Sequence, residues 1–118
     1  MRAVRAVPLV AVGGFVGATA RYAVSLVLPV LVATFAANVL GCFALGYLLY
    51  TYRLDGVSER VRLVAATGFL SSFTTYSTFA QEVFTSSPTV GVAYVAASYA
   101  VGFSAVYAGT RLALRCEG

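Results

Sequence analysis

A segment dense in hydroxyl groups, SSFTTYSTF at residues 71–79, lies inside an apolar run of the sequence. Seven of its nine side chains carry a hydroxyl, although 60% of the chain is hydrophobic. Ser and Thr compete with the backbone for hydrogen bonds, which favours a break in a helix. Unwound backbone at membrane depth is tolerated where it lines a cavity, and its carbonyls can hold a cation. The segment therefore indicates a pathway for a small ion.

The same segment carries aromatic residues at helical spacing. Phe73, Tyr76 and Phe79 recur every three residues and would share one arc of a helix. The edge of an aromatic ring is positive and can contact an anion. An aromatic packing stripe is the alternative that the spacing leaves open.

Other polar residues also fall within apolar runs. Asn38 is either an interhelical hydrogen-bonding residue or part of the pathway. Arg21 either extends to the lipid headgroups or faces a vestibule that attracts anions. Glu82 is assigned to the membrane boundary and to no site. Five glycines are interpreted as packing positions between helices: Gly13, Gly14, Gly17, Gly41 and Gly46.

The residue types that are missing exclude several classes of protein. The chain contains no His, so metal ligation and nucleophilic catalysis lack their usual groups, and we expect no enzyme. A basic face with interleaved aromatics is absent, which excludes a nucleic-acid partner. A small four-helix proton-coupled exporter would need a carboxylate in the first span, and the first acidic residue is Asp55. The hydroxyls, the amide and the aromatic rings that remain suit a small anion.

Long apolar runs must position these groups. Only 10% of the 118 residues are charged, which predicts a single all-α integral membrane domain in a lipid bilayer. Four runs are long enough to cross roughly 30 Å of hydrocarbon as helices. The expected transmembrane helices are residues 7–28, 31–52, 61–84 and 90–114, with the third broken near its middle.

The arginines predict the orientation of these four helices. Four crossings place the N-terminus, the 52–62 loop and the C-terminus on one side of the membrane. All eight basic residues are arginine, and only Arg21 falls on the opposite side. The first side holds the other seven: Arg2, Arg5, Arg53, Arg60, Arg62, Arg111 and Arg115. Cytoplasmic loops are enriched in basic residues, so both termini are expected in the cytoplasm of a plasma-membrane protein.

Four motifs in order resemble the fluoride channel family (Fluc, also called CrcB) across nearly the whole chain. They are GGFVGATARY at 13–22, TFAANVLGCFALG at 34–46, GFLSSFTTYSTF at 68–79, and Tyr94 followed four residues later by Ser98. The resemblance implies an antiparallel dimer with two fluoride pores, passive fluoride export that lowers the cytoplasmic concentration, and a structural sodium ion at the interface.

The resemblance also implies a role for each matching residue. Tyr76 and Phe79 take the pore-aromatic positions, and Arg21 takes the vestibule position. Backbone carbonyls of Ser71 and Thr74 would hold the sodium ion. The remaining fluoride-pathway positions are polar: Asn38, Ser77, Thr78, Tyr94 and Ser98.

Two features depart from the family pattern. Tyr76 replaces the usual Phe, and its hydroxyl would either coordinate fluoride or block its path. Ser71 and Ser72 replace the usual Gly-Gly pair and lose glycine's freedom at positive φ.

The charge bias predicts the partner. An antiparallel homodimer needs a chain that inserts both ways, whereas seven arginines on one side favour one orientation. We therefore expect a homologous second chain, inserted oppositely, rather than a second copy. The alternatives are a coupled exporter and a non-conducting subunit of a heterodimeric channel.

Overall fold

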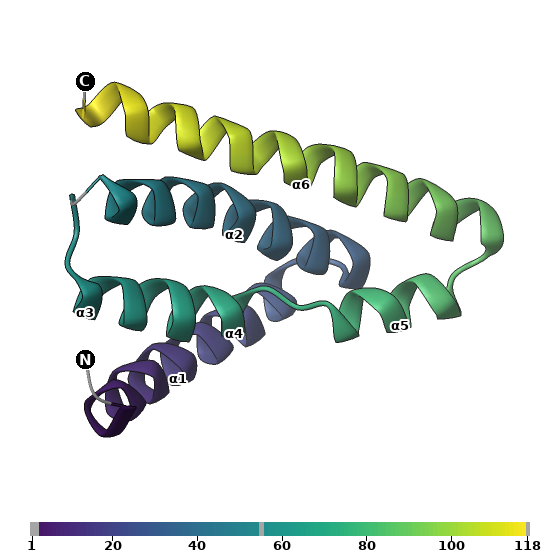
Figure 1. Ribbon diagram of the computed structural model, residues 1–118. Helices are drawn as coiled ribbons and strands as arrows, with labels where there is room; N and C mark the ends of the chain where they lie inside the picture. Colours follow the sequence, from purple (N-terminus) through teal and green to yellow (C-terminus); the bar gives the residue numbers. More distant parts are fainter. Residues whose placement is uncertain (1–2, 55, 118) are drawn as a thin grey trace.

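The computed structural model describes residues 3–54 and 56–117, in which all regular structure is helical (Figure 1). The all-α prediction is thereby confirmed, while Arg2 and Asp55 lie outside the described residues. In chain order the elements are α1 (Ala3–Val27), α2 (Val30–Arg53), α3 (Glu59–Val61), the π-helix η1 (Arg62–Leu70), α4 (Ser71–Phe73), α5 (Ser77–Thr85) and α6 (Pro88–Glu117).

Within the described residues, three helices are long and apolar enough to cross a membrane, namely α1, α2 and α6. Their outer surfaces carry large apolar side chains: Phe15 is 75% exposed and Tyr22 is 65% exposed. Water would penalise such a surface and lipid would not. The molecule therefore has the surface of a protein that spans a membrane several times.

The helices form two packed pairs. Helices α2 and α6 run side by side in the same direction, and η1 and α4 pack against α1 (Figure 1). The beginning of α1, the connection between α2 and α3, and the end of α6 all lie at the same end of the molecule (Figure 1).

Glycines allow these helices to approach closely. A Cβ atom on Gly17 of α1 would overlap the Phe69 carbonyl oxygen of η1. A Cβ on Gly46 of α2 would likewise overlap the Val106 carbonyl oxygen of α6. Small residues at such contacts let helix backbones approach and pack by van der Waals contact. The other three predicted glycines also lie against close neighbours, in line with the packing interpretation. A Cβ on Gly13 would overlap the Val64 carbonyl oxygen, one on Gly14 would lie close to the Ser72 hydroxyl, and one on Gly41 would overlap the Thr74 methyl group.

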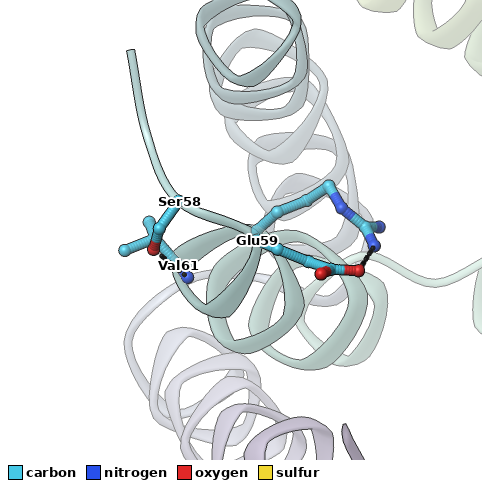
Figure 2. A network of polar contacts seen from close by, with 4 residues as sticks. Ser58, Glu59 and Val61 are labelled. Atoms are coloured by element: carbon cyan, nitrogen blue, oxygen red, sulfur yellow. Dashed lines mark hydrogen bonds and ion pairs between the residues drawn. The ribbon is translucent and has the colours of Figure 1, made fainter. Parts of the chain in front are cut away.

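The third helical region begins with a capped turn (Figure 2). The Val61 amide donates to Ser58 Oγ over 3.2 Å, which satisfies one of the free amides at a helix start. Glu59 and Arg62 form an ion pair of 3.7 Å in the same turn. The Arg62 guanidinium also lies 5.1 Å from the centre of the Tyr52 ring. The first two contacts stabilise the turn itself, and the Arg62–Tyr52 contact connects it to the end of α2.

Candidate functional site

Helical backbone stops at Phe73 and resumes at Ser77, so residues 74–76 interrupt the third helical region. Thr74 is extended, with φ −81° and ψ 158°. The hydroxyls before the interruption bond backward to carbonyls one turn earlier. Thr74 Oγ1 donates to the Leu70 carbonyl over 2.8 Å, and Ser71 Oγ donates to the Thr67 carbonyl. This competition with backbone donors is the behaviour expected of Ser and Thr in apolar helices.

Asn38 of α2 binds the backbone at the interruption through both of its amide atoms. Its Nδ2 donates to the Thr75 carbonyl over 3.0 Å, and its Oδ1 accepts from the Thr75 amide over 2.8 Å. Thr75 lies outside helical structure, so its backbone groups need partners from elsewhere. Asn38 supplies them, which makes it an interhelical hydrogen-bonding residue in this structure.

A cavity of about 410 Å³ lies beside the interruption, between α2, α4, α5 and α6. It brings together six of the predicted site residues: Asn38, Ser71, Thr74, Tyr76, Phe79 and Ser98. Ser98 Oγ is buried and has no hydrogen-bond partner among the described residues. A buried hydroxyl without a partner is costly, and it leaves a free donor for a ligand.

Aromatic rings form a chain along one side of this cavity. Phe79 is 8% exposed, and its ring centre lies 6.2 Å from that of Tyr76 and 5.1 Å from that of Tyr94. Tyr99 meets Phe79 at 87°, an edge-to-face contact at 6.2 Å. Tyr76 itself is 73% exposed. Tyr99 also lines the cavity, although it was not among the predicted site residues; its place one residue after Ser98 was the available signal.

Glu82 is the main residue that the sequence analysis missed. It is buried at 8% exposure inside the bundle, which the sequence did not indicate, while its place at the membrane boundary stays a prediction. Thr34 Oγ1 donates to Glu82 Oε2 over 3.0 Å, and the Tyr94 hydroxyl donates to Oε1 over 2.9 Å. The available signal was its spacing: Glu82 follows Phe79 by three residues and shares its helix face.

The other predicted residues are not part of the cavity lining. Tyr94 belongs to the Glu82 cluster, and Ser77 is exposed at the start of α5. The Thr78 amide donates to Thr75 Oγ1 over 3.2 Å, so Thr78 contributes its backbone to the interruption. Arg21 is half-buried on α1, and its Nε is buried with no hydrogen-bond partner among the described residues.

Apolar helices around an interrupted, polar segment define a small multi-pass membrane protein. Comparison with known proteins then identifies its family. A family model described as "CrcB-like protein, Camphor Resistance (CrcB)" matches residues 8–110. The chain belongs to this family, which confirms the resemblance read from the four motifs.

Curated relatives cover nearly the whole chain. It is 52% identical to fluoride-specific ion channel FluC 1 of Natronomonas pharaonis, over 86% of this chain and 88% of the relative. It is 47% identical to FluC 1 of Haloarcula marismortui, over 90% and 84% of the two chains. It is 43% identical to FluC 2 of Halobacterium salinarum, over 97% and 91%. These relatives are named as ion channels and not as enzymes.

Proposed function

We propose that this chain is a subunit of a fluoride-specific ion channel that passively exports fluoride from the cytoplasm. The observation that carries the proposal is the cavity at the interruption, which gathers Asn38, Phe79 and Ser98 in a chain whose relatives are named fluoride channels. Fluoride is small and strongly hydrated, so it loses water only where donors replace it. The free Ser98 hydroxyl and the edges of the Tyr76 and Phe79 rings are such groups.

The proposed channel subunit crosses the plasma membrane four times. Residues 59–85 form the third crossing, broken at residues 74–76, while α1, α2 and α6 form the others. Both termini lie in the cytoplasm, because seven of the eight arginines fall on that side. Arg21, on the opposite side, attracts anions to the outer mouth.

The sodium proposal is supported by backbone carbonyls at the interruption. In a continuous helix the Thr75 amide would donate to the Ser71 carbonyl, and the Thr78 amide to the Thr74 carbonyl. Here these amides donate to Asn38 Oδ1 and to Thr75 Oγ1 instead. Ser71 and Thr74 therefore fit a structural sodium ion, which prefers oxygen ligands. A second subunit would supply further oxygens at the interface.

We further propose that the channel is an antiparallel dimer with a homologous chain of opposite orientation. The one-sided arginines support this pairing, because they favour a single orientation for this chain. The test is expression in a fluoride-sensitive strain that lacks its own exporters. We expect rescue only when the partner gene is present; full rescue by this chain alone would overturn the heterodimer.

The channel function is tested by fluoride efflux from liposomes, with chloride as the control anion. We expect fluoride efflux without a proton gradient, and none for chloride. Phe79→Ile removes the ring edge and should slow fluoride efflux at least tenfold. Tyr76→Phe is the comparison variant, because it keeps the ring and loses only the hydroxyl. Chloride efflux equal to fluoride efflux, or no effect of Phe79→Ile, would contradict the proposed pathway.

Two alternatives have a specific observation in their favour. The buried Glu82 carboxylate is a titratable group inside the bundle, as a proton-coupled exporter requires. The exposed ring and hydroxyl of Tyr76 border the cavity, as a pore-blocking residue would in a non-conducting subunit. A strict requirement for a proton gradient would favour the exporter. Efflux that appears only in Tyr76→Phe would favour the non-conducting subunit.

A further inference from the structure

The Asn38 side chain is the polar link between α2 and the interruption. Its two hydrogen bonds, 3.0 and 2.8 Å long, both go to the backbone of one residue, Thr75. Two bonds from one planar amide fix the orientation of the backbone on either side of Thr75. Asn38 is itself held in the continuous helix α2, so a rigid element defines where residues 74–76 lie.

These two bonds determine which carbonyls of the segment are released. The Thr75 amide would serve the Ser71 carbonyl in a continuous helix, but Asn38 Oδ1 takes it. With Thr75 held in this position, its own Oγ1 takes the Thr78 amide, which would otherwise serve the Thr74 carbonyl. The two diverted amides are therefore the helical partners of the two proposed sodium ligands.

A steric contact one turn further along α2 supports the same arrangement. Gly41 faces Thr74, and a Cβ atom at Gly41 would overlap the Thr74 methyl group. The backbone of Thr74 is anchored on its other side, because its amide donates to the Leu70 carbonyl over 2.9 Å. Asn38 and Gly41 thus form a matching surface on α2 for residues 74 and 75.

We propose that Asn38 is a positioning residue for the sodium site, in that it diverts the Thr75 amide and so leaves the Ser71 carbonyl free for the cation. The role rests on the proposed channel function, from which the sodium site comes. Without the Asn38 amide, the Thr75 amide returns to the Ser71 carbonyl and the helix closes across the interruption. The site then loses an oxygen ligand.

The same side chain also borders the anion pathway. The amide nitrogen of Asn carries two hydrogens, and the Thr75 carbonyl accepts one of them. Asn38 lines the cavity beside Phe79 and Ser98. One amide thus contacts both the backbone that holds the cation site and the space that fluoride would occupy. Under the proposal, cation binding is thereby linked to the shape of the anion pathway.

The experiment measures sodium binding by thermal unfolding of the full chain in the assembly in which it purifies. The melting temperature is recorded against sodium concentration, with N-methyl-D-glucamine holding the ionic strength constant. Asn38→Ala should raise the sodium concentration for half-maximal stabilisation by about tenfold or more. Asn38→Asp keeps the oxygen that accepts from the Thr75 amide and loses the donor to the Thr75 carbonyl, so its midpoint should rise by less than that of Asn38→Ala.

Thr51→Val is the matched control on the same helix. Thr51 is buried, and its hydroxyl donates to the Tyr47 carbonyl, away from the interruption. The control should lower the melting temperature without changing the sodium midpoint. If Asn38→Ala does not fold, Asn38→Leu provides the test, because it keeps most of the side-chain volume and removes both hydrogen bonds to Thr75. It should also raise the sodium midpoint.

An unchanged sodium midpoint in folded Asn38→Ala or Asn38→Leu overturns the proposal, as does a wild-type protein that sodium does not stabilise. Fluoride efflux from the same wild-type preparation separates this result from the channel function. A sodium response that depends on Asn38 without any efflux would refute the channel and leave the positioning role intact. Efflux with a sodium response that ignores Asn38 would refute the positioning role alone.

Discussion

The glycine-packed helix pairs and the interrupted segment satisfy their backbones in opposite ways. Between α2 and α6, glycine lets two regular helices touch backbone to backbone, and each helix keeps its own hydrogen bonds. At residues 71–78, the side chains of Asn38 and Thr75 replace helical partners. The first region has no room for an added atom at Gly46 or Gly109, and the second depends on a few polar atoms. Rigidity in one region allows backbone groups to stay available in the other.

The largest expected effect comes from adding one methyl group to the glycine contacts. Gly109→Ala would place a Cβ against the Phe43 carbonyl oxygen, and a backbone carbonyl cannot move aside as a side chain can. We expect a loss of about 3 kcal/mol, the upper end for overpacking, measured by thermal unfolding in detergent. Gly102→Ala is the control on the same helix, because its Cβ would lie 3.6 Å from Cys42 Sγ. Equal stability of the two variants would show that the close backbone contact at Gly109 does not limit the packing of α2 and α6.

Glu82 tests whether polar contacts outside the interruption are as critical as those within it. Glu82→Gln replaces an oxygen that accepts from Thr34 or Tyr94 with a donor, so one buried hydroxyl loses its acceptor. We expect a loss of about 2 kcal/mol in unfolding free energy. Glu59→Gln, at a side chain that is 43% exposed, should change stability by less than about 0.5 kcal/mol. A Glu82→Gln variant as stable as the wild type would show that neither hydroxyl depends on this carboxylate as its acceptor.

Tyr99 tests the aromatic side of the interrupted region. Tyr99→Leu removes the edge-to-face contact with Phe79 while keeping an apolar side chain. We expect a loss of about 1 kcal/mol in unfolding free energy, together with slower fluoride efflux because the Phe79 ring is less constrained. Tyr107→Leu, at a position that is 65% exposed, serves as the control. Unchanged efflux in Tyr99→Leu would separate the ring contact from the pathway.

The smallest effect is expected where the third helical region begins. Ser58→Ala removes the acceptor for the Val61 amide (Figure 2) and should cost about 0.5 kcal/mol, the low end for a helix cap. Thermal unfolding measures it, and Ser58→Asp should restore stability because Asp also caps. A loss as large as that of Gly109→Ala would mean that this turn belongs to the rigid region.

Much of the fold follows from local sequence signals. Apolar runs longer than 20 residues predicted the helices, and closely spaced small residues predicted their contacts, because both properties depend on neighbours along one helix. The hydroxyl density at 71–79 likewise directed attention to the segment where the helical backbone stops. Each of these signals is contained within a single element.

The contacts between elements could not be read in this way. The partner of Asn38 is a backbone group 37 residues away, and no side-chain type reveals a free backbone amide. Burial of Glu82 depends on where Thr34 and Tyr94 lie on two other helices, so its position at the end of an apolar run was misleading. The π-helix η1 gives no composition signal, since a shift in hydrogen-bond register leaves the residue types unchanged.

The position of the chain ends has a consequence for protein engineering. Because the start of α1 and the end of α6 lie at the same end of the molecule (Figure 1), a soluble linker from one copy to the next keeps both copies parallel. An inverted pair made as one polypeptide would need a linker that itself crosses the bilayer once. Two tandem genes, one with a water-soluble linker and one with a single hydrophobic helix as linker, would thus force the two opposite arrangements.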